Sequence, residues 1–248
     1  MALALADSLA AHPDLDERDL MRRFTEWHER GTTSCTGTCF DIGITTRQAL
    51  ARWKGTGNPI AGSTDPNTAG NGSLMRLAPV AVRHWRDRAP LRNVAARQSR
   101  TTHAAPEAVD ACVAYAEVLA DAIAGERRSL VLRAREDLAG AAGPLSGAIG
   151  PILAGGWRSK PRKVIRASGY VAHSLEAAIW SVGASSDFRS AVLRAANLGE
   201  DADTTAAITG QLAGALCGLS GIPEEWRGKV AWGPRIIGMA EGLVDAAH

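Results

Sequence analysis

The stretch that says most about this chain is Gly199-Glu-Asp-Ala-Asp-Thr-Thr205, which runs into Ala206-Ala-Ile-Thr-Gly-Gln-Leu-Ala-Gly-Ala215. The alanine-rich run predicts a helix. Asp201, Asp203 and Thr204 then stand at its start, where two carboxylates and a hydroxyl offer the hard oxygen ligands that suit Mg²⁺ or Mn²⁺. The alternative is that Asp203 or Thr204 only caps the helix, since both residue types are favoured there. An EF-hand is excluded, because the glycine and the bidentate glutamate of its loop are missing from their positions.

A second informative segment is Gly70-Asn-Gly-Ser-Leu-Met-Arg-Leu-Ala-Pro-Val80. Gly70 and Gly72 permit a tight turn, and Asn71 and Ser73 bring polar side chains to the start of the next apolar segment. Backbone N–H groups at such a turn, with a helix N-terminus behind them, suit phosphate oxygens. Neither common nucleotide fingerprint fits the segment. Taken alone, it predicts a polar turn that caps a helix, with phosphate binding as the alternative.

Two further blocks complete a family resemblance: Ser99-Arg-Thr-Thr-His-Ala-Ala-Pro-Glu-Ala108 and Ser168-Gly-Tyr-Val-Ala-His-Ser-Leu-Glu-Ala177. In order and spacing, the four blocks resemble the ADP-ribosylglycohydrolases, the family that includes the dinitrogenase-reductase-activating glycohydrolase. The resemblance runs from Met1 to about Trp232. It implies an all-α fold with a two-metal centre, usually of Mg²⁺ or Mn²⁺, that removes ADP-ribose from a modified protein or from a small molecule that contains ADP-ribose.

The resemblance also implies roles for individual residues. Asp201, Asp203 and Thr204 match metal ligands, and Asp201 is the first choice for a catalytic role in orienting the attacking water. Asp41 matches a stretch near the cleft and is a candidate for a catalytic contact, although an acid on a glycine-flanked loop is usually a turn residue. The residues that the resemblance places around the diphosphate, the ribose and the rest of the cleft are Asn71, Gly72, Ser73, Arg76, His103, Gly169 and Tyr170.

Three of these substrate-binding residues have other interpretations. His103 could cap a helix or lie on the surface, and Arg76 could pair with a surface acid instead of reaching the diphosphate. Tyr170 could belong to the core, stack on adenine or hydrogen-bond a ribose.

The chain also departs from the family pattern. Members begin with a Gly-Asp-rich helix and a Thr-Asp-Asp-Thr block that supplies further metal ligands, and no Thr-Asp-Asp occurs here. We therefore expect half a metal site, with apolar surface exposed on Leu3, Leu5 and Leu9. The leading hypothesis is a metal-dependent ADP-ribosyl hydrolase. The alternatives are a catalytically impaired ADP-ribose-binding module and a plain helical structural protein with the acid cluster as a cap.

Length and composition agree with one compact, multi-helix domain over residues 1–248. The resemblance implies that this domain lacks the usual N-terminal segment of the family. The formal charge is +2, from 28 basic and 26 acidic residues, so no bulk attraction to nucleic acid is indicated. No apolar run of 18 residues is present to span a membrane. The four cysteines form neither a disulfide framework nor a zinc site, a usage that predicts a reducing cytoplasm.

The hydrophobic periodicity is helical throughout. Residues 107–123 show it best, with an apolar face opposite an acidic one, and residues 16–28 repeat the pattern behind Asp16 as N-cap. Gly210, Gly214 and Gly218 share one helix face, which predicts that another backbone packs very close to it. The remaining helices are predicted over residues 1–10, 44–53, 73–85, 168–182, 186–197, 204–219 and 234–246, with 130–132 also helical and loops over 54–72 and 143–162.

Overall fold

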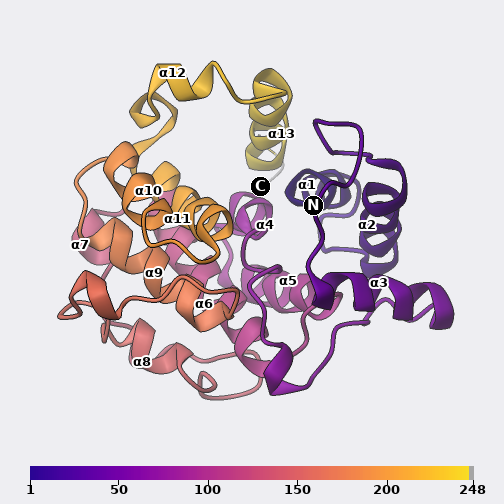
Figure 1. Ribbon diagram of the computed structural model, residues 1–248, viewed down its shortest axis with the longest axis horizontal. Coiled ribbons are helices and arrows are strands. Elements are labelled where there is room, and N and C mark those ends of the chain that lie inside the picture. The colour runs from indigo at the N-terminus through magenta and orange to yellow at the C-terminus, as the bar shows by residue number, and fades with distance from the viewer. Residues whose placement is uncertain (246–248) are drawn as a thin grey trace.

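The computed structural model describes residues 1–245, and within them the chain is helical, with no strand. Figure 1 shows the helices gathered into a single body. The α-helices are α1 (Ala2–Ala11), α2 (Glu17–Arg30), α3 (Ile44–Thr56), α4 (Ala78–His84), α5 (Arg88–Arg100), α6 (Pro106–Ile123), α7 (Arg128–Val131), α8 (Ile149–Leu153), α9 (Val171–Gly183), α10 (Phe188–Ala196), α11 (Ala202–Cys217), α12 (Glu224–Arg227) and α13 (Gly233–Asp245). Short 3₁₀ turns are η1 (Pro66–Thr68), η2 (Arg162–Val164) and η3 (Leu219–Gly221).

Helix α6 lies at the centre of the core. All of its residues between Ala108 and Ala122 are buried, its acids included. It packs against α4, α5, α9 and α11, which surround it (Figure 1). A helix that is buried on all sides needs small and apolar residues on all sides, and the many alanines of α6 meet that need. The acidic face is buried too, because arginines from neighbouring segments pair with it, as Arg88 does with Asp121.

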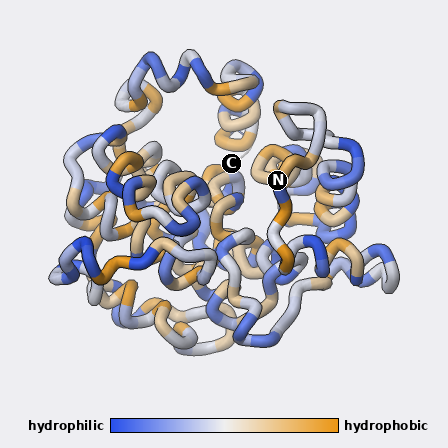
Figure 2. The backbone as a smooth tube through the Cα atoms, viewed as in Figure 1, coloured by the Kyte–Doolittle hydropathy of each residue, from blue (hydrophilic) through white to orange (hydrophobic). Residues whose placement is uncertain are grey.

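The outer helices carry their apolar residues on one side only. Along α2, hydrophilic and hydrophobic stretches alternate, as Figure 2 shows. Leu20, Met21 and Phe24 are buried, while Asp16 caps the helix by accepting hydrogen bonds from the backbone N–H groups of Arg18 and Asp19. The N-cap predicted at Asp16 is therefore confirmed.

Most predicted helices are present, with boundary shifts of a few residues. Helix α4 is shorter than predicted, because residues 73–77 form turns and the helix begins only at Ala78, next to Pro79. Helices α5, α8 and α12 were not predicted. The sequence of α5 is polar and contains Pro90, but this proline lies in the first turn, where its missing N–H costs no helix hydrogen bond. The end of the predicted helix 234–246 lies outside the described residues.

Two packing expectations were wrong. Within residues 1–245, no backbone packs against the glycines of α11: a Cβ at Gly210 would meet nothing within 4 Å, and one at Gly214 would reach only the Phe188 side chain at 3.8 Å. The expected exposure of Leu3, Leu5 and Leu9 is not found either. Leu3 is half-buried, and α1 buries Leu5 and Leu9 completely against α2, α4 and α13. Among the described residues, no helix has both the length and the apolar character to cross a bilayer.

Candidate functional site

The glycine-rich turn and the Gly169–Tyr170 pair lie side by side, although about 100 residues separate them in the sequence. An isolated antiparallel bridge joins Gly70 to Tyr170. The backbone N–H of Asn71 donates to the carbonyl oxygen of Gly169 at 3.0 Å. The backbone N–H of Val171 donates to the carbonyl oxygen of Ala69 at 2.9 Å. Two of the four sequence blocks are therefore held together by their own backbones.

The start of α11 joins the same place through Asp201. Its backbone N–H donates to the carbonyl oxygen of Ala167 at 2.9 Å. Its Oδ2 accepts a hydrogen bond of 2.7 Å from Nδ2 of Asn71, which also donates to Oγ of Ser174 at 2.8 Å. A Cβ added to Gly169 would lie 3.8 Å from the same Oδ2. The predicted metal ligand, the polar turn and the Gly169 segment thus meet at one carboxylate.

The first turn of α11 leaves its side-chain oxygen atoms largely free. Asp201 is the N-cap residue, yet its side chain makes no capping hydrogen bond. Asp203 is exposed and Thr204 is half-buried, and no hydrogen bond of either side chain is present within residues 1–245. The helix-capping alternative therefore does not describe this turn, in which the side chains of Asp203 and Thr204 have no partner among the described residues.

This donor set suits one hydrated divalent ion. Carboxylate and hydroxyl oxygens are hard ligands, and Mg²⁺ usually keeps several waters while binding one or two carboxylates. Over residues 1–245 there is no group of three or more His, Cys, Asp and Glu side chains that could enclose a metal. Asp201, Asp203 and Thr204 offer oxygen atoms of this kind at the start of α11. Metal binding there, and the two-metal centre implied by the resemblance, stay expectations.

His103 packs against the glycine-rich turn. A Cβ at Gly72 would lie 2.8 Å from Cε1 of the ring, and one at Gly70 would lie 3.3 Å from Nε2. His103 is 3% exposed, and its Nδ1 lies 2.8 Å from Oγ1 of Thr102. Burial, assisted by the positive charge of Arg76, lowers the pKa of His103 to about 3. His103 is therefore a neutral, buried ring that packs against the turn. A side chain at Gly70 or at Gly72 would have to displace this ring.

Ser73 and Arg76 point into the protein. Ser73 is fully buried, and its Oγ accepts a hydrogen bond from Ser99 at 2.8 Å. Arg76 is 1% exposed and donates to the Oε1 and carbonyl oxygens of Gln98 at 2.9 and 2.8 Å. Its guanidinium lies 4.6 Å from the ring centroid of Phe24. These contacts place Arg76 beneath the turn, where it pairs with no surface acid of the described residues.

Tyr170 is half-buried, and its hydroxyl is already engaged. It donates to Oε2 of Glu107 at 2.5 Å, and its ring meets His173 edge-on with centroids 5.0 Å apart. Burial, the hydrogen bond to Glu107 and the negative charge of that residue raise the pKa of Tyr170 to about 12. The hydroxyl is therefore protonated at neutral pH and donates its hydrogen bond to Glu107. The ring and the lone pairs of the hydroxyl oxygen are left for contact with a ligand.

Asp41 lies in the loop between α2 and α3 and is exposed. Its carbonyl oxygen accepts a weak hydrogen bond from Sγ of Cys39 at 3.4 Å, and within residues 1–245 its carboxylate pairs with no basic side chain. The following helix reaches the site, because Oγ1 of Thr46 lies 3.5 Å from where a Cβ on Gly72 would stand. The first turn of α3, which follows the Asp41 loop, is thus next to the glycine-rich turn.

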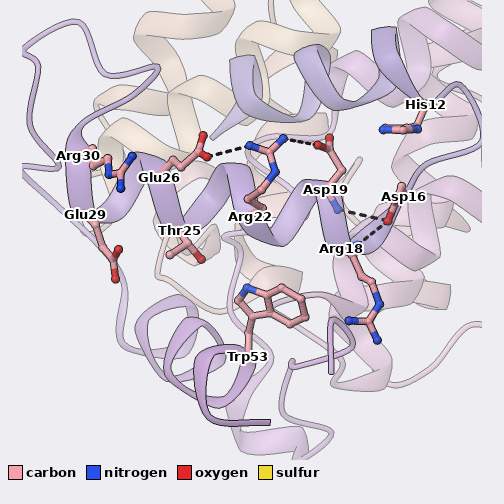
Figure 3. A pocket seen from close by; sticks show the side chains of 10 residues that line it. All are labelled: His12, Asp16, Arg18, Asp19, Arg22, Thr25, Glu26, Glu29, Arg30 and Trp53. Atoms are coloured by element: carbon pink, nitrogen blue, oxygen red, sulfur yellow. Dashed lines mark hydrogen bonds and ion pairs between the residues drawn. The ribbon is translucent and has the colours of Figure 1, made fainter. Parts of the chain in front are cut away.

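A wide cavity along α2, of about 590 Å³, is a different feature (Figure 3). Arg22 lies in its middle and bonds to Asp19 at 2.5 Å and to Glu26 at 2.8 Å. Glu29 pairs with Lys54 outside the cavity. Of its carboxylates, Asp19, Glu26 and Glu29 are paired with bases, and Asp16 caps α2. Because no predicted site residue lines it either, this cavity is a solvated charged face.

Sequence reasoning missed two residues of the site. Ser174 and Glu107 both lie within the blocks that carry the resemblance, but nothing local distinguishes them from ordinary helix residues. Ser174 supports Asn71, and Glu107 supports Tyr170. Their partners lie 103 and 63 residues away, so only the folded chain identifies them.

Comparison with known proteins gives a consistent result. The model of the ADP-ribosylglycohydrolase family matches residues 1–248. ADP-ribosylarginine hydrolase Tri1 of Pseudomonas putida (strain GB-1) is 44% identical to this chain, over 100% of the chain and 65% of that protein. The protein of the same name from Serratia proteamaculans (strain 568) is 40% identical, over 98% of the chain and 65% of that protein. The chain therefore spans about 65% of the length of these two relatives.

Two more distant matches agree. ADP-ribosyl-[dinitrogen reductase] glycohydrolase of Rhodospirillum rubrum is 28% identical, over 93% of this chain and 71% of that protein. A solved structure described as an ADP-ribosylglycohydrolase-related protein complex has a TM-score of 0.85 and 36% sequence identity, and the match covers 100% of this chain and 80% of that one. The all-α fold expected from the sequence is confirmed.

Proposed function

Because the chain belongs to the ADP-ribosylglycohydrolase family, we propose that it hydrolyses the bond between ADP-ribose and a modified acceptor. The observation that carries the proposal is the 2.7 Å hydrogen bond from Asn71 to Asp201. It brings the polar turn and the acidic helix start to one place, as a site that handles both a diphosphate and a metal-bound sugar requires. Neither motif would suffice alone.

Arginine is the acceptor that we propose. Two relatives at 44% and 40% identity are named ADP-ribosylarginine hydrolases. The bond to be broken would then be the N-glycosidic bond between the ribose anomeric carbon and the guanidino group. Water supplies a hydroxyl group to the anomeric carbon, and its remaining proton goes to the guanidino nitrogen, which restores the unmodified arginine side chain.

Asp201, Asp203 and Thr204 would hold Mg²⁺ or Mn²⁺. When bound, such an ion polarises a water and holds ribose hydroxyls. Asp201 has a second task in this proposal, which is to orient the attacking water. Its Oδ2 is fixed by Asn71, so the plane of the carboxylate is set before substrate arrives. Positive charge develops on the sugar in the transition state, and the carboxylate of Asp201 would stabilise it.

The other predicted residues divide into two groups. The residues that would contact ADP-ribose are Asn71, Gly72, Gly169 and Tyr170. The buried residues that would support the turn are Ser73, Arg76 and His103. Asp41 is exposed, and it precedes the helix whose Thr46 lies next to Gly72. It would contact the acceptor side of the scissile bond. The four cysteines are unpaired, which supports a reducing compartment such as the cytoplasm.

The test is release of ADP-ribose from a peptide that carries one ADP-ribosylated arginine, with Mg²⁺ or Mn²⁺ supplied. Asp201→Asn should lower kcat by at least about a hundredfold, since it removes both charge and ligand. Asp16→Asn is the matched control, because it makes the same change at the N-cap of α2 and should leave kcat unaltered. No release by the wild type would contradict the proposal. Tight binding of ADP-ribose without release would favour the alternative, a binding module.

A further inference from the structure

Glu107 connects two segments that flank a cavity beside the candidate site. Its Oε2 accepts the hydroxyl of Tyr170 at 2.5 Å, and its Oε1 accepts the backbone N–H of Ala148 at 2.8 Å. Tyr170 and Ala148 both line a cavity of about 440 Å³, together with Ile152 and His173. One carboxylate therefore holds two walls of this cavity at a set separation.

The local structure is built to receive this carboxylate. Gly147 has φ +51, and a Cβ at that position would lie 1.8 Å from Oε1 of Glu107. Glu107 itself stands in the first turn of α6, directly after Pro106. The loop can approach Glu107 closely only because residue 147 is glycine. A negative charge at a helix N-terminus is also stabilised by the helix dipole.

We propose that Glu107 is a positioning residue for ADP-ribose: it acts through the hydroxyl of Tyr170 and sets the orientation of that ring in the site. This inference rests on the proposed function, since Tyr170 is taken to contact ADP-ribose. The hydroxyl cannot serve both Glu107 and a ribose with its single proton. Toward the ligand, Tyr170 can therefore offer its ring and its hydroxyl oxygen as an acceptor, but no donor. The placement of both depends on Glu107.

Asp110 offers a matched control one turn further along α6. Its Oδ1 accepts the N–H of Ala141 at 2.8 Å, and its Oδ2 accepts the N–H and Oγ of Ser146. It thus pins the same loop as Glu107, by the same chemistry, but no hydrogen bond joins it to Tyr170. If only the loosening of the loop matters, substitution of either residue should weaken ADP-ribose binding. If Glu107 acts through Tyr170, only substitution of Glu107 should do so.

The experiment measures ADP-ribose affinity by calorimetry and the pKa of Tyr170 by NMR of ¹³Cζ-labelled tyrosine. The chain has two tyrosines, and Tyr170→Phe assigns the signals. Glu107→Gln should weaken ADP-ribose binding about tenfold, a typical result of losing a hydrogen bond to a charged group. The same variant should lower the pKa of Tyr170, because it removes the acceptor charge that favours the protonated phenol. Asp110→Asn should change neither quantity.

A double variant completes the test. If Glu107 acts through the hydroxyl, adding Glu107→Gln to Tyr170→Phe should weaken binding no further than Tyr170→Phe alone. Additive losses would overturn the proposal, as would a Glu107→Gln variant that lowers the pKa of Tyr170 yet binds ADP-ribose like the wild type. Absence of ADP-ribose binding by the wild type would refute the proposed function instead, and the inference would fall with it. Glu107→Gln keeps the size of the side chain, and thermal unfolding checks that each variant is folded.

Discussion

Nδ2 of Asn71 donates a 2.7 Å hydrogen bond to Oδ2 of Asp201, across 130 residues of sequence. The amide also donates to Ser174, so both of its N–H groups are used. A carboxylate held in this way has one oxygen committed to the protein, and its other oxygen makes no hydrogen bond to the described residues. This relationship links the turn to the metal ligands and leads to the first prediction.

Asn71→Ala should destabilise the protein and impair the site together. Removal of the amide leaves Ser174 and Asp201 without their shared donor, which should cost about 1–3 kcal/mol of unfolding free energy. It should also lower kcat by at least about tenfold, because the orientation of Asp201 is lost. Urea unfolding and ADP-ribose release measure the two effects. Asn93→Ala, at an exposed position of α5, should alter neither; wild-type kinetics in Asn71→Ala would show that the bond is only structural.

Asp203→Ala should weaken Mn²⁺ or Mg²⁺ binding without harming the fold. Asp203 is exposed in the first turn of α11, so its loss should cost only the helix-dipole contribution, about 0.3–1 kcal/mol. Loss of a carboxylate ligand should raise the dissociation constant of the metal at least about tenfold. Calorimetric titration provides the measurement, with Asp187→Ala at the N-cap of α10 as the control. Equal metal affinity in Asp203→Ala and wild type would remove the metal assignment.

Two glycine substitutions should have opposite effects. A Cβ at Gly72 would lie 2.8 Å from the buried ring of His103, so Gly72→Ala should cost about 1–3 kcal/mol of stability through overpacking. The displaced turn should also bind ADP-ribose more weakly. Gly210 meets nothing within 4 Å in the interior of α11, and Gly210→Ala should stabilise the protein by about 1 kcal/mol. Thermal unfolding measures the stability of both variants, and titration measures their affinity for ADP-ribose. A Gly72→Ala variant that is more stable than wild type and binds ADP-ribose normally would contradict the prediction.

His103 should make stability depend on pH between about 6.5 and 3. Burial lowers its pKa to about 3 from an ordinary value of 6.5, so in this interval the unfolded chain binds a proton that the folded protein does not. Stability contributed by the neutral ring is present above pH 6.5 and is lost as the pH falls, by at most about 1.4 kcal/mol per pH unit. Urea unfolding at about pH 7.5 and about pH 5 should therefore show that the unfolding free energy falls more between these pH values in wild type than in His103→Gln. Identical slopes would mean that the ring is accessible to protons in the folded protein.

The helices and the residue blocks of the candidate site were accessible from the sequence, but the contacts that support them were not. The amphipathic patterns of 107–123 and 16–28 predicted α6 and α2 closely, and Asp16 was recognised as a cap. The polar helix α5 was missed because its pattern is dominated by arginines, which become informative only once their partners are known. Arg97, for example, bonds to Glu17 of α2 at 2.6 Å.

Local sequence determines what depends on a few neighbouring residues: helix propensity, capping, turn-forming glycines, and the oxygen-rich start of α11. Burial and pairing depend on which distant segments pack together, and only the tertiary structure decides them. It placed Arg76 in the core although an arginine after a polar turn suggests the surface, and it gave Glu107 a role that no motif marks. The physical reason is the range of the interactions. Propensity acts within one or two turns, whereas the hydrogen bond that joins Asn71 to Asp201 exists only after α6, α9 and α11 have packed around one core.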